Sequence, residues 1–595
     1  MTRALDSAVT YGQHSIWTLQ RLEPGLCTFN GMHAVSVDEP LDREAFARAV
    51  AGLVGRHEAM RTVFPADARS GLPVPRVLDR VDVPIEWHAT NDDTDALLAR
   101  LWADGQRPYD LDRGPLTRIS VYVRPSGEQV VLLAMHHVTS DLGSARLALE
   151  ELEARYRAIV TGQPDPFPPL RVQYREFAAS QHEMLESPAG QRHEDYWRTQ
   201  LGDGFAALAM PYDRQRPPLE VRRGDTWLFD LPASLITRLE SRAREANGTL
   251  FPLLLASLAT VLHRVSGSAP IMMGSYSSGR VRAELKTMVG LISNPLPVRV
   301  DLSPGQSFLE LTRAVSATVR AGYRHQVYPL HLMAERLQTS HDPSRPPLIQ
   351  AGLNLHPEGP WQLTDATWRH NAWLPILLRN QEGQFELMAS VCLRRDGSAL
   401  VGLQYQTALY NRDTIGHLAK LWTTALDDIA AHADRTVDTV RLMSAEDEHR
   451  VLVEWNRTER AYERDLGLHE LVRRQSLATP DGIAVRHRDQ SVTYRQLMAR
   501  VDEITVPLRR MGATLGTVIG ICLDPSIDQV AALVAILEVG GAYLPLDPTH
   551  PLERRRLMLT DARAAILVAS RQTGADLEGV PRLDIDVLPP IDAAA

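Results

Sequence analysis

The chain has 595 residues, of which 64 are Lys or Arg and 73 are Asp or Glu, so the net charge of −9 argues against a nucleic-acid-binding protein. A hydrophobic content of 44% and a charged content of 23% exclude a largely disordered chain. The length exceeds that of one hydrophobic core, so we expect roughly two to four domains.

The three cysteines, Cys27, Cys392 and Cys522, lie far apart and lack the spacing of a metal site. They predict neither a disulfide framework nor bound metal, as is typical of a reducing compartment. The N-terminus has no apolar signal-peptide core, and no stretch approaches the roughly 20 apolar residues of a membrane helix. We therefore expect a cytoplasmic protein with no membrane partner and no nucleic-acid partner.

The first block of elements, from about residue 7 to 170, alternates helices with strands. Its patterns predict an amphipathic element over 11–19, a helix over 42–55, a charged helix end turning into a strand over 56–64, a strand with one polar face over 117–124 and a strand over 130–135. The last of these is an unbroken apolar run, which is typical of a strand buried on both faces. A helix is predicted after Asp141 and ends near Gly162.

A polar corner follows the apolar strand, where His136 and His137 precede Asp141 at the start of the helix. Two imidazoles at the end of a buried strand are costly unless they are hydrogen-bonded. A histidine is also the commonest side chain for moving protons near neutral pH. A histidine pair alone could simply be the polar end of a strand, but together with the motifs below it favours a functional site.

A second histidine, His57, lies in a charged stretch between the first helix and the strand that follows it. On its own it could be catalytic. Its neighbours Arg56, Glu58 and Arg61 instead suggest a structural ion-pair cluster.

The second block, from about 171 to 450, repeats this alternation without repeating the sequence. We predict helices over 174–186, 193–201 and 250–265, and strands over 227–230 and 271–276. Pro295 and Pro297 argue against a central strand in the stretch 289–299.

Seven of these stretches, in order, resemble the successive motifs of the condensation domain of nonribosomal peptide synthetases. They are Gln13 with Trp17, residues 56–64, His136-His137 with Asp141, residues 174–178, the stretch with Gly290, Asn294 and Arg299, His325-Gln326, and Ser344-Arg345. One double-histidine motif would be weak evidence, whereas the ordered set is specific. The resemblance implies an α/β fold of two chloramphenicol-acetyltransferase-like lobes in a V-shaped pseudo-dimer, with an N-lobe over 1–175, a C-lobe over 176–440 and a tunnel between them.

The remainder resembles the beginning of an adenylation domain. Residues 492–497 and 537–547 look like its first two motifs, with a predicted strand over 518–523 and a helix over 527–537 between them. Residues 441–465 resemble an interdomain linker, and 466–595 a partial α/β adenylation subdomain. Such a domain needs a Ser/Thr/Gly-rich loop to approach a triphosphate, and 466–595 contains neither that loop nor any lysine. We expect this segment to be inactive in adenylate formation.

The resemblance also implies the chemistry and the residues. Donor and acceptor peptidyl carrier proteins deliver thioesters on phosphopantetheine arms, and no cofactor is bound covalently. His137 is the principal catalytic residue, as proton acceptor, amine-orienting group or oxyanion donor; these roles stay open. His136 and Asp141 complete the catalytic motif, His136 as a packed support and Asp141 paired with Arg280. Arg280, Arg61 and His57 are assigned structural support, and Leu142, Gly143, Ser144 and Asn294 are assigned to the substrate tunnel.

One departure concerns the position after Asp141, where the family usually has glycine and this chain has Leu142. Leu142 either turns into the core while Gly143 keeps the channel open, or narrows the acceptor side of the tunnel.

Three alternative functions remain. A heterocyclisation domain would carry Asp in place of His136, and an epimerisation domain does not normally precede an adenylation domain. A catalytically silent platform that recruits carrier proteins is disfavoured by the retained His136, His137, Asp141 and Arg280. Because the chain begins close to Gln13, we expect the donor either to come from another polypeptide or to be a free acyl thioester.

Overall fold

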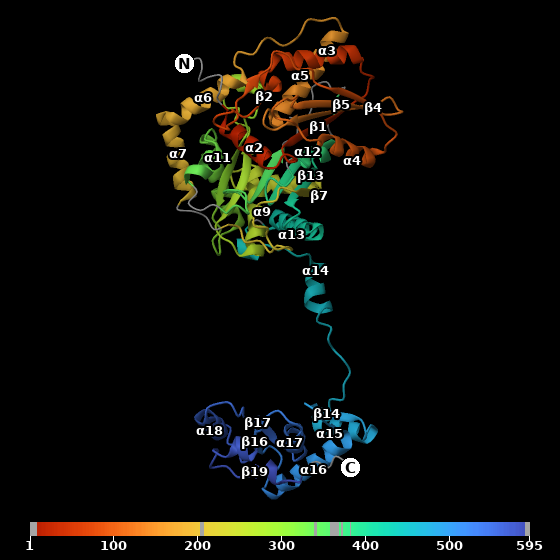
Figure 1. Cartoon of the computed structure of the whole chain (residues 1–595), viewed down its shortest axis with the longest axis vertical. Coiled ribbons are helices and arrows are strands. Elements are labelled where there is room, and N and C mark those ends of the chain that lie inside the picture. The colour runs from red at the N-terminus through yellow and green to blue at the C-terminus, as the bar shows by residue number, and fades with distance from the viewer. Residues whose placement is uncertain are drawn as a thin grey trace. The chain divides into compact units, whose positions relative to one another are not determined.

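The computed structural model describes residues 9–202, 207–337, 342–356, 368–369, 373–380, 382–432 and 434–589. The chain divides into two compact units, Met1–Glu454 and Trp455–Ala595 (Figure 1). The division falls inside the stretch expected to be a linker.

The first unit contains a five-stranded sheet in the order β11-β1-β6-β5-β4. Its strands are β11 (Trp368–Arg369), β1 (Asn30–Val37), β6 (Gln129–His136), β5 (Thr117–Val123) and β4 (Ile85–Ala89). Alternate residues of β6 pack with α3 (Arg43–Arg56) and α5 (Leu142–Val160), and the others with α4 (Thr94–Gly105). The prediction that 130–135 is buried on both faces is therefore confirmed.

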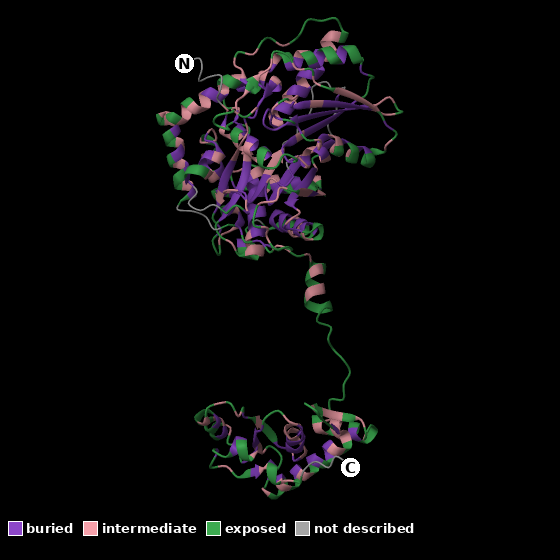
Figure 2. Cartoon of the chain, viewed as in Figure 1, coloured by how far each residue is buried: buried purple, intermediate pink, exposed green. Residues whose placement is uncertain are grey.

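The second sheet of this unit has six strands in the order β7-β13-β12-β10-β8-β9. They are β7 (Gly224–Leu231), β13 (Ala399–Gln406), β12 (Leu387–Leu393), β10 (Ala351–His356), β8 (Ile271–Ser277) and β9 (Asn294–Val300). One face packs against α8 (Ala233–Glu245), α9 (Leu250–Ser266), α10 (Phe308–Arg324) and α13 (Arg412–Ala431). β9 carries Pro295 and Pro297 and is an edge strand, where a missing backbone donor is tolerated. Figure 2 shows the buried strands of both sheets.

Two short segments from the second half of this unit tie the sheets together. β11 pairs antiparallel with β1, and Trp368 is buried against Phe46 of α3. α12 (Leu374–Leu378) places Ile376 in the core cluster of the first sheet and Leu378 in a cluster with residues of the second. The first sheet is thus completed by a strand that lies about 330 positions later in the sequence than β1.

The other elements of the first unit surround these sheets. They are α2 (Tyr11–Leu22), the short helices Glu58–Arg61, Ala283–Thr287, Val437–Thr439 and Arg450–Glu454, β2 (Thr62–Val63), β3 (Arg76–Val77), α6 (Tyr174–Glu186), α7 (Pro188–Leu201), α11 (Leu330–Leu337) and α14 (Ala445–His449). The helix predicted over 174–186 is present with those limits, whereas the one predicted from 193 begins at Pro188, where Ser187 caps its first turn.

The second unit has a four-stranded parallel sheet, β17-β16-β18-β19, and a hairpin of β14 and β15. Its elements are α15 (Leu468–Ala478), β14 (Ile483–His487), β15 (Gln490–Thr493), α16 (Tyr494–Arg510), β16 (Val518–Cys522), α17 (Ile527–Glu538), β17 (Ala542–Pro545), α18 (Leu552–Asp561), β18 (Ile566–Ala569), α19 (Arg571–Gly574), β19 (Arg582–Asp584) and a final short helix at Ile585–Val587. The expected mixed α/β class is confirmed for the chain. Across the described ranges, no single helix is long and apolar enough to span a membrane; only α8 and α9, bent by 99°, meet that test as a pair.

Candidate functional site

The corner between β6 and α5 is held by hydrogen bonds from three sides. The N–H of His137 donates to the carbonyl of Phe29 at 2.8 Å, and Gln13 of α2 donates to the carbonyl of Val138 at 2.9 Å. Asp141 caps α5 by accepting the N–H of Ser144 at 2.8 Å. The loop that carries the two histidines is therefore fixed relative to the sheet and to α2.

The imidazole of His137 has one engaged nitrogen. Its Nδ1 lies 2.6 Å from the carbonyl oxygen of Ser140. Because a carbonyl oxygen only accepts, Nδ1 carries the proton and Nε2 keeps its lone pair. Burial lowers the pKa of His137, against the raising effects of the Ser140 carbonyl and Asp141, so the neutral imidazole predominates near neutral pH.

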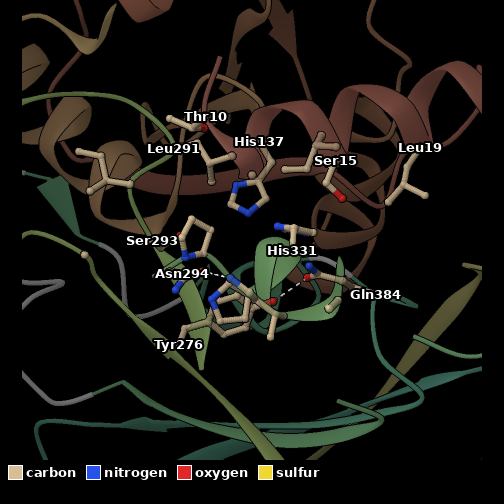
Figure 3. A pocket seen from close by; sticks show the side chains of 18 of the residues that line it. Thr10, Ser15, Leu19, His137, Tyr276, Leu291, Ser293, Asn294, His331 and Gln384 are labelled. Carbon is tan, nitrogen blue, oxygen red and sulfur yellow. Dashed lines mark hydrogen bonds between the residues drawn. The ribbon is translucent and has the colours of Figure 1, made fainter. Parts of the chain in front are cut away.

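Two cavities, of about 900 and 770 Å³, meet at His137. The same four further residues line both of them, namely Tyr276, Ser293, Gln384 and Phe385. The first cavity lies along α2 and α11, as Figure 3 shows from close by, and the second borders the start of α5. A group at His137 is therefore accessible to reactants held in either cavity.

Asp141 is a buried carboxylate with every oxygen engaged. Its Oδ1 and Oδ2 accept from the two terminal nitrogens of Arg280, each at 2.8 Å. Oδ2 also accepts the N–H groups of Ile292 and Ser293, at 3.0 and 2.8 Å. Burial alone would raise the pKa of the Asp141 carboxyl, but Arg280 and Ser144 lower it to about 2. The expected Asp141–Arg280 contact is present, and it joins the end of β6 to the segment that follows β8.

Residues 288–293, which we call the clasp loop, receive further bonds from the first half of the unit. The Ser144 hydroxyl donates to the carbonyl of Gly290 at 2.7 Å, and the hydroxyl of Tyr174 donates to that of Leu291 at 2.7 Å. A Cβ at Gly290 would lie 1.9 Å from the Tyr174 ring, so only glycine fits there. Ser144 is fully buried and lines neither cavity, and its hydroxyl bonds to the clasp loop, so its assignment to the tunnel stays a prediction without support from this lining.

His136 lines neither cavity. It is buried, its Nδ1 accepts the N–H of Val138 at 3.2 Å, and its Nε2 lies 3.3 Å from the side-chain oxygen of Gln20. Burial, with smaller effects of His137 and Arg118, lowers the pKa of His136 to about 3. These contacts suit a neutral packed support, which the sequence analysis predicted within the motif.

His57 lies in an ion-pair cluster, as expected, but only one of the expected neighbours takes part in it. Its Nε2 is 3.1 Å from Glu151 of α5, and Arg56 pairs with the same carboxylate, whereas Glu58 lies 3.4 Å from Arg175. Of the three neighbours expected in the cluster, Arg56 takes part, whereas Glu58 and Arg61 do not, because sequence neighbours on a short helix point in different directions. His57 also accepts the N–H of Val289 in the clasp loop at 3.4 Å.

Arg61 binds backbone groups near the first sheet and does not take part in the site. It donates to the backbone carbonyls of Val54 and Leu78 and lines neither cavity. Asn294 does line the first cavity, as expected. Its amide is fully used: it donates to the carbonyls of Gln326 and Tyr328 and accepts the N–H of Leu330 at 3.0 Å.

Leu142 and Gly143 both line the second cavity. Leu142 is half-buried and lies outside the core clusters, so it does not turn into the core. A Cβ at Gly143 would lie 2.9 Å from the Arg280 guanidinium, so this glycine leaves room for the Arg280–Asp141 pair.

His331 is a site residue that the sequence analysis missed. It is the second residue of α11, lines the first cavity and points into it as His137 does (Figure 3). Burial, then the neighbouring His14 and His137, lowers the pKa of His331 to about 4. Its only sequence signal is its place two residues after Pro329, beside the His325-Gln326 motif. Nowhere in the described ranges do three His, Cys, Asp or Glu side chains gather as a metal site.

We expect the protein to lose stability in mild acid because of His136 and His331. The pKa values of His136 and His331 are lowered in the folded unit, so the unfolded chain takes up protons near pH 6.5 while the folded chain does not. Each group should lower the free energy of unfolding by up to about 1.4 kcal/mol per pH unit as the pH falls from 6.5 toward 4. Urea denaturation at pH 7.0, 6.0 and 5.0 measures this slope, which His331→Gln should reduce. Equal stability at pH 7.0 and 5.0 would contradict the expectation.

Two families match the chain. Residues 6–452 match the family described as Condensation domain, and residues 472–591 match that described as AMP-binding enzyme. Phosphinothricin tripeptide synthetase PhsB of Streptomyces viridochromogenes is 33% identical over 96% of this chain and 48% of its own length. One polypeptide of the linear gramicidin synthase of Brevibacillus parabrevis is 32% identical over 96% of this chain. The chain spans 7% of that polypeptide, and therefore only part of each of these curated relatives.

Solved structures share the fold. A four-domain holo nonribosomal peptide synthetase bound to AMP and glycine superimposes with a TM-score of 0.85 and 22% identity, over 98% of this chain and 45% of its own. The X-domain from teicoplanin biosynthesis superimposes with a TM-score of 0.65 and 24% identity, over 73% of this chain and 97% of its own.

Proposed function

The chain belongs to the condensation-domain family of nonribosomal peptide synthetases, followed by the N-terminal part of an AMP-binding domain, and from this premise we propose that it joins two carrier-bound substrates through an amide bond. The donor is an acyl or aminoacyl thioester, and the acceptor is the amine of an aminoacyl thioester. One observation carries the proposal. His137 lies where the two cavities meet, and its Nε2 has no hydrogen-bond partner among the described residues.

The reaction needs the acceptor nitrogen to attack the donor carbonyl carbon. The new C–N bond forms as the C–S bond breaks, and the donor carrier leaves as its free thiol. The amine must be neutral or lose a proton on attack, and Nε2 of a neutral His137 accepts a proton or a hydrogen bond from it. Much of the rate comes from holding the two tethered reactants together, each in its own cavity.

The partners in this proposal are donor and acceptor peptidyl carrier proteins with their phosphopantetheine arms, and the remainder of a synthetase. Two cavities that meet at one imidazole support a two-reactant reaction better than a one-substrate reaction. A cytoplasmic location fits such partners.

A condensation assay tests the proposal. The chain is mixed with donor-loaded and acceptor-loaded carrier proteins, and the acceptor carrier is analysed by mass spectrometry for the added acyl mass. Transfer to the acceptor amine supports amide formation. Binding of both loaded carriers without transfer would favour a silent docking platform, and inversion of a carrier-bound aminoacyl centre would favour an epimerisation-type relative.

We also infer that residues 466–595 by themselves form no aminoacyl adenylate. They contain no lysine and no Ser/Thr/Gly-rich loop to surround a triphosphate. Amino-acid-dependent pyrophosphate exchange by this chain, tested over the proteinogenic amino acids, would contradict the inference.

We propose that Leu142 narrows the acceptor route. Its side chain lines the second cavity at the first residue of α5. Leu142→Gly should widen the range of accepted amines in the condensation assay, with His137 still required. Because glycine also costs about 1 kcal/mol in a helix, Leu142→Ala is the matched variant that shortens the side chain and keeps the helix former. An unchanged acceptor profile in both variants would show that Leu142 only packs.

A further inference from the structure

One wall of the second cavity is the face of the six-stranded sheet that its helices do not cover. Along β10, β12 and β13, Leu353, Val391 and Leu403 belong to the core on the helical side. Their neighbours Asn354, Ser390 and Gln404 alternate to the other face and line the cavity. Asn354 and Ser390 are Cα partners in the parallel pair of β10 and β12, so their side chains emerge side by side.

These three residues and Gln384, which we call the polar wall, hold atoms with no partner among the residues that the structure describes. The side-chain oxygen of Asn354 accepts the N–H of Tyr276 at 3.2 Å, which leaves its NH₂ group free. The oxygen of Gln384 accepts the Tyr276 hydroxyl at 2.7 Å, which leaves a second NH₂ group free.

The other two residues complete the pattern. Gln404 donates to the backbone carbonyls of Leu378 and Asn380, both at 2.7 Å, so its own oxygen stays available. The Ser390 hydroxyl makes no hydrogen bond with the described residues, although Ser390 is only 5% exposed. Asn354 and Gln384 are half-buried and Ser390 is buried, and donors that line a cavity in this way are stabilised when a ligand supplies acceptor oxygens.

The charge of the second cavity agrees with such a ligand. Arg146, Arg280 and Arg320 line it; Arg280 is paired with Asp141, the acidic residue among the described lining residues, and Arg146 lies 3.6 Å from Glu150. The first cavity instead carries charges of both signs, from Glu23 and Glu220 as well as Arg222, Arg282 and Arg345.

We infer that the second cavity selects a reactant whose side chain ends in a carbonyl oxygen, a carboxamide or a carboxylate. The two free NH₂ groups and the Ser390 hydroxyl donate to that oxygen, and the Gln404 oxygen accepts from a carboxamide. The inference rests on the proposed function for its reactants, and it names the substrate class of one side of the site.

Three nearly isosteric probes test it by binding alone: asparagine, aspartate and leucine, each joined as an amide to the pantetheine analogue in which an amine replaces the thiol. Isothermal titration calorimetry with the whole chain should give at least about tenfold tighter binding of the asparagine or aspartate probe than of the leucine probe. The rank of asparagine and aspartate distinguishes the carboxamide from the carboxylate.

Two variants locate the preference. Ser390→Ala removes a hydroxyl with no protein partner and should lower affinity for the preferred probe about fivefold, with leucine unchanged. Asn354→Asp keeps the acceptor for the Tyr276 N–H but replaces the free donor by an oxygen, so aspartate binding should be lost first. Ser234→Ala, on α8 and outside both cavities, is the matched control that should change nothing.

Equal or tighter binding of the leucine probe overturns the inference, as does a preference that survives both variants, or no binding of any probe. A chain that forms no amide yet keeps the preference would instead refute the proposed function, because binding is measured without catalysis.

Discussion

Replacing His137 with alanine is expected to lower the rate of amide formation at least about 100-fold with saturating loaded carriers. The substitution removes the Nε2 lone pair at the junction of the two cavities, where the acceptor amine must lose or share its proton. The fold should persist, because among the described residues the His137 side chain is hydrogen-bonded only to the carbonyl of Ser140.

Single-turnover quenching with mass-spectrometric detection measures the effect on chemistry and separates it from carrier release. His263→Ala is a matched control, since His263 lies in the last turn of α9, bonds to the carbonyl of Ser268 and lines neither cavity. A His137→Ala protein that turns over at close to the wild-type rate would refute the catalytic assignment, and one that fails to fold would show that His137 is structural.

Replacing Asp141 with asparagine is expected to lower the free energy of unfolding by about 3 kcal/mol, because the Arg280 guanidinium then stays buried without its counter-charge. The neutral side chain also accepts fewer of the bonds from Ser144, Ile292, Ser293 and Arg280 that hold the clasp loop. Activity should fall with stability, since the clasp loop ends at Ser293, which borders both cavities.

A double-mutant cycle with Asp141→Asn and Arg280→Gln measures the pair by urea denaturation. The exposed Arg299–Asp301 pair, 2.7 Å apart, provides the comparison and should couple by less than about 1 kcal/mol. If the Asp141–Arg280 coupling is no larger than that of the exposed pair, the brace contributes nothing specific to stability.

The elements predicted well are those whose periodicity is uninterrupted. The strand predicted over 130–135 is one residue shorter than β6 at each end, and the helix predicted over 250–265 is one residue shorter than α9 at its C-terminal end. Both predictions succeed because each element is apolar or packed on every side. No strand was predicted over β10, β12 or β13. Their hydrophobic pattern is broken by Asn354, His356, Ser390 and Gln404, which face the second cavity. The positions that interrupt the pattern are thus the ones the site uses.

The candidate site was predictable where a motif is local. His136, His137 and Asp141 lie close together in the sequence. Their geometry therefore follows from the end of a strand and the N-cap of the next helix. The partners of His57 were not predictable, because Glu151 is 94 positions away and meets it only through the packing of α3 on α5. His331 likewise reaches the first cavity through the placement of α11, which no spacing along the chain indicates.

The strand β11 has a consequence for exchanging parts between synthetases. A chimera that replaces residues 176–440 by those of another protein also replaces the edge strand of the first sheet, which pairs Ser36 and Val37 with Arg369 and Trp368. If the strand in the replacement segment matches poorly, the outer edge of β1 is left without a paired strand. An unpaired sheet edge favours aggregation. Crossover points that retain 368–369 with residues 1–175 should therefore give more monomeric protein than a cut at a single position between the halves.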